Sequence, residues 1–325
     1  MLNKITGKRV VVTGASGYIA SKLISKLINL GAIPLRVSRK SLTPQGGALD
    51  LIGNLEEYGT WVELLKFSDL IFHLAGNTSI NFADNHAPES ISTTLIPISN
   101  LYKASKLLKK KPRVLFASTA SVYPFNHNGI ITEKTPTLPI TNYDLHKVFA
   151  EQQLSLGSTE DVMIATSLRL SNVYGPSEHQ PLSEDRGIFN KMIMQAWGNN
   201  LITIYGNGDQ FRDYIFIDDV IEAFIKIGFS GKKLDPIYNI CLGTSVTINA
   251  AFNLISQIAN NEFGKNSSVE YQEWPNNPSP VERRSFFSSP LLAHKHLNWS
   301  PKTSLEDGIR AQLNYLSKKF NGKQS

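Results

Sequence analysis

The sequence holds a single cysteine, Cys241, among its 325 residues. One cysteine allows no internal disulfide and no cysteine-based zinc site, and it fits a reducing compartment. No apolar run reaches the roughly 18 residues that a membrane-spanning helix needs. The N-terminal residues also contain no apolar stretch typical of a secretory signal. We therefore expect a cytoplasmic protein with no membrane partner and no metal site.

Internal repeats and low-complexity tracts are also missing. Hydrophobic residues make up 41% of the chain and charged residues 18%, so an ordinary globular protein of one or two domains is expected. The net charge is +6, and several lysines fall between positions 103 and 113, at the end of an expected helix. Cations are favourable there, and neither interleaved aromatics nor a known module accompanies them. We expect a solvated helix end and no nucleic-acid polymer as partner.

The N-terminal segment has the pattern of a strand, a glycine turn, a helix and a second strand. Residues 10–12 are valines, Gly14 and Gly17 form the turn, and residues 33–37 are apolar again. Such a βαβ unit points backbone N–H groups and a helix N-terminus at a pyrophosphate. The spacing Gly-x-x-Gly-x-x-Ala, which ends at Ala20, differs from the usual Gly-x-Gly-x-x-Gly fingerprint. An ordinary strand-to-helix turn is the alternative interpretation.

An acidic residue is missing where NAD-binding folds place one to hold the ribose 2′-hydroxyl, about 20 residues past the glycine turn. Ser38 ends the second strand instead, and Arg39 and Lys40 follow. Two cations would suit the 2′-phosphate of NADP, although they could also be plain surface charges. Asp50, at the end of an expected third strand with Leu51, is placed to meet the adenine amino group. We predict NADP or NAD as the cofactor and favour NADP.

Apolar runs and helical patterns alternate as far as residue 170. Further strands are expected at residues 69–74, 114–119 and 162–170, with helices over 89–111 and 143–154. The alternation predicts an α/β protein with a Rossmann-type doubly wound parallel sheet, which binds ligands at the carboxyl ends of its strands. Beyond residue 170 the alternation breaks, and a smaller mixed α+β domain is expected. We predict a dinucleotide-binding domain over 1–170, to which 215–243 returns, and a substrate-binding domain over 171–214 and 244–325.

Tyr143 and Lys147 lie one helical turn apart on the same face of an expected helix. A lysine beside a phenol favours the phenolate, which should draw the tyrosine pKa from about 10 towards neutrality. Such a phenol can exchange a proton with an alcohol oxygen while a hydride is transferred at the same carbon. Thr119, at the end of the strand over 114–119, can place a hydroxyl on the same oxygen. We predict that Thr119, Tyr143 and Lys147 are catalytic, with a purely structural role as the alternative.

The tyrosine–lysine spacing alone is not specific, since the chain contains it three more times. The other pairs are Tyr18/Lys22, Tyr102/Lys106 and Tyr315/Lys319. One of them falls inside the glycine turn, one precedes the strand over 114–119, and one lies in the C-terminal tail. Only Tyr143 follows the carboxyl end of that strand by a single loop.

Taken in order, the motifs resemble the extended short-chain dehydrogenase/reductase family, in its nucleotide-sugar epimerase, dehydratase and reductase branch. The resemblance covers nearly the whole chain. The matching segments are TGASGYIA (13–20), HLAG (73–76), STASVY (118–123), YDLHK (143–147), RLSNVYGP (169–176), IYGNGDQFRD (204–213), DDV (218–220) and LNWSP (297–301).

The resemblance implies roles for individual residues. Tyr143 would be the acid/base, Lys147 would also hold the nicotinamide ribose, and Asn172 would bind a nucleotide-diphosphate sugar. Arg212 would bind the diphosphate, with Arg283 or Arg284 as a second contact; these last two could equally be surface charges. Helices near residues 100 and 150 would form a homodimer. The whole cofactor-binding prediction comprises Gly14, Ser16, Gly17, Tyr18, Ile19, Ser38, Arg39, Asp50, Leu51, Leu74, Ala75, Gly76, Tyr143 and Lys147.

Departures from the family pattern reduce the number of reactions that this protein is expected to catalyse. Family dehydratases carry Asp-Glu after the catalytic threonine, whereas Ala120 and Ser121 stand here, which argues against C5/C6 dehydration. Reductases that also epimerise at C3 and C5 place a cysteine near the site, but Cys241 falls in a late strand. We expect His127 and His146 to be solvent-exposed, with a role in proton transfer as the alternative interpretation.

Two hypotheses about the enzymatic reaction remain open. In a 4-epimerase, a tightly held cofactor takes the hydride from C4 of a hexose and returns it to the other face of the 4-keto sugar. In a 4-keto reductase, NADPH gives its hydride once and leaves. The missing acid at Ser38 favours the reductase, and the C-terminal resemblance favours the epimerase. A non-catalytic dinucleotide sensor is a third, more distant hypothesis.

Overall fold

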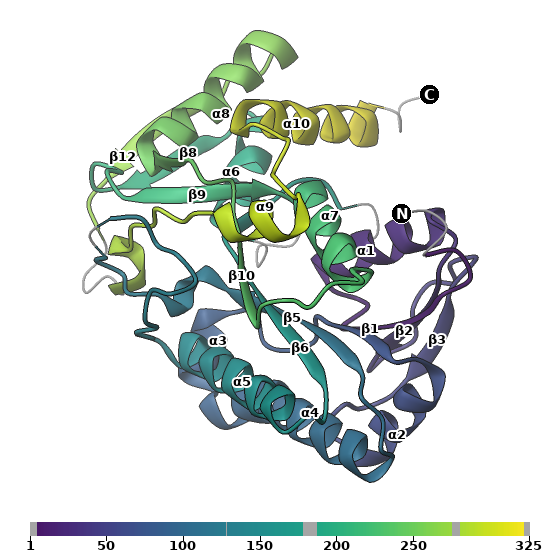
Figure 1. Cartoon of the computed structure of the whole chain (residues 1–325). Coiled ribbons are helices and arrows are strands. Elements are labelled where there is room, and N and C mark those ends of the chain that lie inside the picture. Colours follow the sequence, from purple (N-terminus) through teal and green to yellow (C-terminus); the bar gives the residue numbers. More distant parts are fainter. Residues whose placement is uncertain (1–4, 128, 178–186, 275–279, 322–325) are drawn as a thin grey trace.

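A seven-stranded sheet forms the centre of the molecule (Figure 1). The computed structural model describes residues 5–127, 129–177, 187–274 and 280–321. The strand order is β10-β6-β5-β4-β1-β2-β3, and every neighbouring pair is parallel. The order reverses between β1 and β4, which is where a doubly wound sheet binds its ligand. The predicted α/β fold is thus confirmed. The strands are β1 Arg9–Thr13, β2 Ile33–Ser38, β3 Leu49–Ile52, β4 Leu70–His73, β5 Arg113–Thr119, β6 Ile164–Leu170 and β10 Ile237–Ile240.

Helices cover both faces of this sheet (Figure 1). The side chains of a strand alternate between its faces, so Val10 and Val12 pack on one side and Val11 on the other, all fully buried. Burying both faces explains why the strands are continuous apolar runs. On the side of Val10 lie α1 Tyr18–Asn29, α7 Ile217–Gly228 and α9 Leu291–Leu297; on the other lie α2 Tyr58–Phe67, α4 Ala87–Leu107 and α5 Asn142–Thr159. The short helix α3 Ile80–Asn85 packs against α4 and α5.

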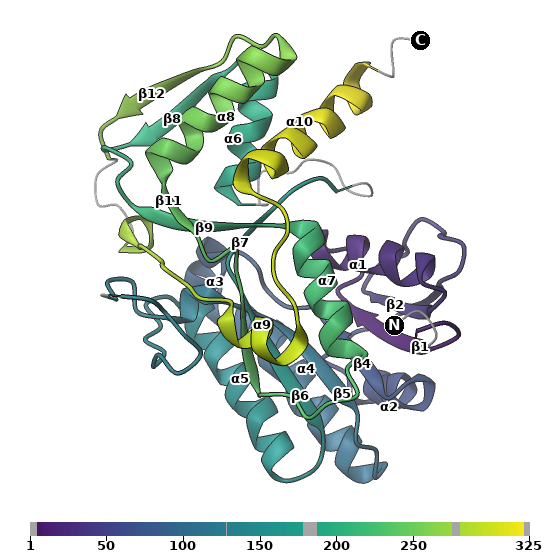
Figure 2. The same cartoon turned by 45° about the horizontal axis from the view of Figure 1, so that its top comes forward.

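A second region with its own apolar core lies at the carboxyl end of the large sheet (Figure 2). Its strands form two small sheets, ordered β11-β9-β7 and β12-β8. The predicted domain boundaries stay a prediction, and residues 178–186 and 275–279 of the expected substrate domain lie outside the described ranges. The elements are β7 Asn172–Tyr174, α6 Ile188–Trp197, β8 Leu201–Tyr205, β9 Phe211–Phe216, β11 Ser245–Thr247, α8 Ile248–Phe263, β12 Ser268–Gln272 and α10 Leu305–Asn321, with short 3₁₀ turns at η2 Ala120–Val122 and η3 Pro280–Arg283.

The buried carboxylate of Asp213 ties together segments that cross between the large sheet and the second region. Asp213 lies on β9 and accepts hydrogen bonds from the Ser171 hydroxyl, 2.7 Å away, and from the backbone N–H groups of Leu242 and Gly243 at 2.9 and 2.8 Å. Ser171 follows β6 and Leu242 follows β10, both strands of the large sheet. Burial raises the pKa of Asp213 to about 6, against the opposing effect of these three donors.

The described ranges bear on three composition-based expectations. None of their helices combines the length and apolar character that a bilayer crossing requires. Within them, no group of three or more His, Cys, Asp or Glu side chains is arranged to hold a metal ion. The basic run at the end of α4 pairs with surface acids, through Lys106–Glu160, Lys110–Asp69 and Lys111–Asp161.

Candidate active site

Three connected cavities follow the carboxyl edge of the large sheet. The glycine cavity, 520 Å³, extends from Arg39 to Gly14 and Gly76. The central cavity, 430 Å³, shares Gly14 with it and reaches Tyr143. The outer cavity, 580 Å³, shares Tyr143 with the central cavity and ends beneath the second region at Trp274. The result is one groove that joins the glycine turn to the second region.

The glycine turn fits the phosphates of a dinucleotide. Gly14 has φ +66°, and a Cβ there would lie 2.8 Å from the backbone nitrogen of Ala75. A Cβ at Gly17 would lie 2.9 Å from the Gly14 carbonyl oxygen. Helix α1 begins directly after Gly17, which provides no side-chain cap, so the first N–H groups of the helix are available to an anion. Glycines are therefore required at both positions, and the bare backbone suits a diphosphate.

Most of the predicted cofactor residues line this groove. Tyr18 and Ile19 line the central cavity. The glycine cavity is lined by eight predicted residues, Gly14, Ser16, Gly17, Ser38, Arg39, Leu74, Ala75 and Gly76.

Neither Asp50 nor Leu51 lines the glycine cavity, so the structure gives no support to the predicted contact of Asp50 with the adenine. Strand β3 continues to Ile52, so Asp50 lies in its middle, where Arg36 holds its carboxylate at 2.6 and 2.7 Å. The segment that follows the strand, residues 53–56, lines the cavity instead. Its position at the carboxyl end of a strand is the signal that could have identified it.

The three predicted catalytic residues lie together on the wall of the central cavity. Thr119 ends β5, and Tyr143 stands in the first turn of α5, which begins after the capping residue Thr141. The Tyr143 and Thr119 side chains are hydrogen-bonded to each other. Lys147 places its Nζ 5.8 Å from the centre of the Tyr143 ring and donates to the Ala117 carbonyl at 2.9 Å. The strand end and the helix start bring a phenol, a hydroxyl and an amine to one place.

The remaining tyrosine–lysine pairs have other surroundings. Tyr18 donates its hydroxyl hydrogen to the Gly175 carbonyl at 2.7 Å, and Tyr315 donates to the Ser177 carbonyl at 2.8 Å. Tyr102 contacts Glu160 and Lys106 at the surface. None of these three hydroxyls has Thr119 among its hydrogen-bond partners named above, whereas Tyr143 lines the central cavity beside Thr119.

The expected lowering of the Tyr143 pKa is wrong in direction. Burial raises the pKa of Tyr143 to about 12, and the adjacent Asp144 carboxylate raises it further, while the Thr119 hydroxyl and, to a smaller extent, Arg284 oppose both. Burial also lowers the pKa of Lys147 to about 8, although Glu151 opposes this shift. The sequence pattern shows which groups are neighbours, but it does not show how deeply the fold buries them.

Polar groups behind the catalytic residues were not predicted as part of the site. Ser121 lies beside Thr119 and contacts Asp144, which pairs with Arg284. We expected His146 to be exposed, but only 2% of it is accessible to solvent. Its Nδ1 lies 2.9 Å from the Ser90 hydroxyl of α4, to which it is hydrogen-bonded. Burial lowers the pKa of His146. These contacts join residues that are far apart in the chain, so no local sequence motif predicts them.

The predicted substrate residues take different positions. Asn172 and Arg212 both line the outer cavity, and the Arg212 guanidinium donates to backbone carbonyls including that of Glu282, 3.0 Å away. Arg284 lines the same cavity but is buried against Asp144. Arg283 is exposed and is not part of the cavity lining. Their roles in binding a diphosphate stay predictions.

Two aromatic rings that sequence reasoning did not single out close the far end of the outer cavity. The ring centres of Tyr205 and Trp274 are 5.8 Å apart. Gly206 has φ +67°, and a Cβ there would lie 2.5 Å from the Trp274 indole nitrogen, so only glycine fits. Tyr205 and Gly206 belong to the segment over 204–213 that resembles the family pattern. No other sequence feature indicated that they are part of the site.

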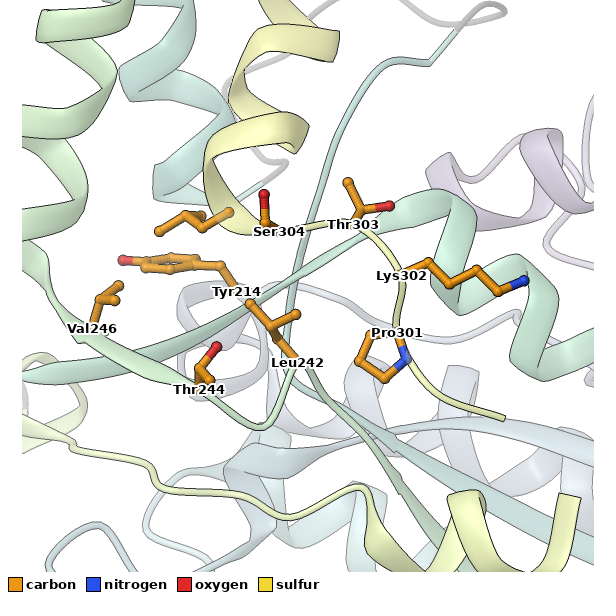
Figure 3. A pocket seen from close by; sticks show the side chains of 9 residues that line it. Tyr214, Leu242, Thr244, Val246, Pro301, Lys302, Thr303 and Ser304 are labelled. Atoms are coloured by element: carbon orange, nitrogen blue, oxygen red, sulfur yellow. The ribbon is translucent and has the colours of Figure 1, made fainter. Parts of the chain in front are cut away.

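A separate cavity of 290 Å³ lies on the other side of Tyr214 (Figure 3). Leu242, Thr244 and Val246 line one wall, and the segment over 301–305 lines the other. The side chain of Lys302 points away from the cavity in Figure 3, and its ammonium group pairs with Glu222 of α7 at 2.9 Å. The wall formed by residues 301–305 thus presents hydroxyl and apolar groups to the cavity, but no charged group.

Known proteins share this fold and much of this sequence pattern. An uncharacterised UDP-glucose epimerase of Bacillus subtilis, YtcB, is 24% identical over 330 residues, which covers 97% of this chain and 99% of that protein. The crystal structure of a UDP-glucose 4-epimerase from Thermotoga maritima with UDP-glucose superposes with a TM-score of 0.86 at 26% identity, covering 96% of this chain and 99% of that one. MoeE5, in complex with UDP-glucuronic acid and NAD, gives a TM-score of 0.82 at 25% identity, with 96% and 99% covered.

The match to a family description is equally extensive. The pattern of the NAD dependent epimerase/dehydratase family matches residues 10–241, a span that includes the glycine turn, Thr119, Tyr143, Lys147 and Arg212. This chain therefore belongs to the NAD-dependent epimerase/dehydratase family.

Proposed function

We propose that this protein catalyses hydride transfer at C4 of the hexose of a nucleotide-diphosphate sugar, as a 4-epimerase or a 4-keto reductase, with Tyr143 as the acid/base. The observation that carries the proposal is the meeting of Thr119, Tyr143 and Lys147 where the central cavity joins the outer cavity. A sugar that reaches inward from the outer cavity would meet a dinucleotide bound along the glycine turn at this junction.

Each catalytic side chain has a task that follows from its chemistry. A bound nicotinamide dinucleotide supplies or accepts the hydride. Tyr143 takes the proton from the sugar hydroxyl during oxidation and returns one to the keto oxygen during reduction. Thr119 forms a hydrogen bond to the same oxygen, and Lys147 in its charged form favours the phenolate state of Tyr143. The backbone N–H groups after Gly17 hold the diphosphate of the dinucleotide.

The outer cavity suits the nucleotide half of the substrate. Its far end offers the rings of Tyr205 and Trp274, on which a base can stack. Arg212 and Asn172 line the same cavity, and a guanidinium binds phosphate oxygens through two parallel hydrogen bonds. We propose this cavity as the site of the nucleoside diphosphate. UDP-glucose, the ligand named for the Thermotoga maritima neighbour, is the first compound to test.

The cofactor distinguishes the two candidate reactions. A 4-epimerase must retain its dinucleotide through both hydride transfers, whereas a reductase exchanges it in each turnover. Protein purified without added cofactor should therefore carry stoichiometric NAD(H) if it is an epimerase. A reductase should be purified empty and should then bind NADPH. The Ser38–Arg39 end of the glycine cavity favours the second candidate, and the named epimerase relatives favour the first.

We expect Arg39→Ala to weaken NADPH binding about 10- to 100-fold and to leave NADH binding nearly unchanged. Arg39 is exposed at the edge of the glycine cavity, so its loss removes a charge-assisted hydrogen bond and little packing. Fluorescence titration with both nucleotides measures the two dissociation constants. Lys40→Ala serves as the control, since Lys40 is also exposed but does not line the cavity. Equal losses for NADPH and NADH would contradict the assignment.

We also expect turnover to fall as the pH rises through about 8. Burial depresses the pKa of Lys147 to about 8, so its ammonium group is charged below that pH and becomes neutral above it. A neutral Lys147 no longer favours the Tyr143 phenolate. An arginine keeps its charge over this range, so Lys147→Arg should lose the alkaline decline even if its maximal rate is lower. A pH profile with the same alkaline decline in both proteins would show that another group causes it.

The predicted homodimer stays a prediction. Helices α4 and α5 expose five large apolar side chains on which a second copy could pack, namely Ile91, Ile96, Leu107, Phe149 and Leu156.

A further inference from the structure

The lining of the central cavity comes from both regions of the molecule. Tyr18 and Ile19 contribute from the first turn of α1, directly after the glycine turn. Residues 187–189 contribute from the start of α6, which belongs to the second region. A dinucleotide that occupies this cavity would therefore touch both regions. How firmly the two regions are joined here decides how easily the cavity opens.

Two hydrogen bonds join the starts of α1 and α6 through the backbone of one residue, Gly175. The Tyr18 hydroxyl donates to the Gly175 carbonyl at 2.7 Å. The backbone N–H of Gly175 donates to Oδ1 of Asn190 at 3.1 Å. Asn190 lies in the first turn of α6 and is 6% exposed, and Gly175 directly follows β7. The Tyr18 hydroxyl thus connects the turn that holds the dinucleotide to the second region.

The carbonyl that accepts the Tyr18 hydrogen bond is firmly held. Gly175 has φ +129°, and a Cβ there would lie 2.8 Å from Cγ2 of Ile217 and 2.9 Å from the ring of Phe216. These two residues form the junction between β9 and α7. The next turn of α1 contacts the same junction, because Lys22 pairs with Asp218 at 3.2 Å. The acceptor is therefore packed against a fixed part of the fold and is not a loosely held loop.

We propose that Tyr18 controls the exchange of the dinucleotide, because its hydroxyl ties the first turn of α1 to the second region at the central cavity. Moving the second region away from α1 breaks this hydrogen bond, both when a dinucleotide enters and when it leaves. The bond therefore slows entry and exit by the same factor and has little effect on affinity. The inference rests on the proposed function, in which a 4-epimerase must retain its dinucleotide through two hydride transfers, but its test needs no sugar.

The test is dinucleotide exchange in Tyr18→Phe, which keeps the ring that lines the cavity and removes only the hydroxyl. Protein with bound NADH or NADPH is mixed with an excess of the corresponding oxidised form in a stopped-flow instrument. The loss of nicotinamide fluorescence gives the dissociation rate, and mixing the reduced form with free protein gives the association rate. We expect both rates to rise about 3- to 10-fold, the effect of one lost neutral hydrogen bond, and the dissociation constant to change less than about twofold.

The variant Tyr315→Phe is the matched control. The Tyr315 hydroxyl also donates to a backbone carbonyl, that of Ser177, at 2.8 Å. Tyr315 lies on α10 and does not line the central cavity, so this hydrogen bond does not involve the first turn of α1. Exchange rates of Tyr315→Phe should equal those of the unsubstituted protein. An equal rise in both variants would indicate a general loosening of the second region and would overturn the proposal.

The remaining outcomes separate the two proposals. Unchanged rates in folded Tyr18→Phe overturn the role of the hydroxyl. Faster release with unchanged entry also overturns it, since the hydroxyl would then act only as a binding contact. Faster exchange in a protein that turns over no nucleotide sugar supports the role of Tyr18 and contradicts the proposed function. If circular dichroism shows that Tyr18→Phe does not fold, Asn190→Ala carries the same prediction, because it removes the acceptor of the Gly175 N–H.

Discussion

Replacing Tyr143 by phenylalanine is expected to lower turnover about 10²- to 10⁴-fold, the contribution that a positioned general acid or base makes to a proton-transfer step. The substitution removes one oxygen atom from a buried ring that lines the central cavity. Nucleotide-sugar binding should change much less, because the outer cavity keeps Arg212 and both aromatic rings. Steady-state kinetics with UDP-glucose, together with NAD(H) and NADP(H), measure the loss in kcat and KM separately.

The chain provides a matched control for this experiment. Tyr102 has a lysine four residues later, as Tyr143 does, but it lies on α4 at the surface, where its hydroxyl contacts Glu160 and Lys106. Tyr102→Phe should leave turnover unchanged. If Tyr143→Phe turned over as fast as the unsubstituted protein, the acid/base assignment would fail, and a dinucleotide-binding role without catalysis would become the better explanation.

Arg284→Met is expected to cause the largest loss of stability, about 3–5 kcal/mol in the free energy of unfolding. The substitution leaves the Asp144 carboxylate fully buried without its cation, with hydrogen bonds, among the described residues, only from the Ser121 hydroxyl at 2.5 Å and the Ile140 backbone N–H at 3.4 Å. The cost is therefore that of an uncompensated buried charge and exceeds the value of the ion pair itself. Urea denaturation followed by circular dichroism measures the difference.

Two further proteins show whether the charge is the cause. The double substitution Asp144→Leu with Arg284→Met removes both charges and should recover most of the loss, because apolar groups often replace a buried ion pair at little cost. Lys111→Met breaks the exposed pair with Asp161 and should change stability little. A double variant no more stable than Arg284→Met alone would mean that lost packing, not the charge, causes the effect.

The fold could be predicted because its main signals are local. Three consecutive buried valines, a turn that needs Gly14 and Gly17, and an amphipathic helix all lie within one short segment, and each is set by its own neighbours in the chain. Tyr143 was separated from three similar pairs by its place after β5, because parallel strands bring their carboxyl ends to one edge. Topology was enough to distinguish Tyr143 from the other three tyrosines, and its catalytic role stays a prediction.

The environment of the site could not be predicted in the same way. Ser121 contacts Asp144 and Asp144 contacts Arg284 across 23 and 140 positions of the chain. The rise in the Tyr143 pKa comes chiefly from burial, which no spacing rule between residues can predict. Asp50 shows the same limit at smaller scale, since β3 continues to Ile52 and the residues that line the cavity are those of the following loop, 53–56.

The single carboxylate of Asp213 also restricts how the groove can open. It binds residues that follow β6 and β10 and itself lies on β9, so three passages of the chain meet at one anchored point. We therefore expect the large sheet and the second region to rotate relative to each other about Asp213 and not to separate. Loss of one of these hydrogen bonds would leave the others in place. Access for a large substrate must come from the rim farthest from that pivot.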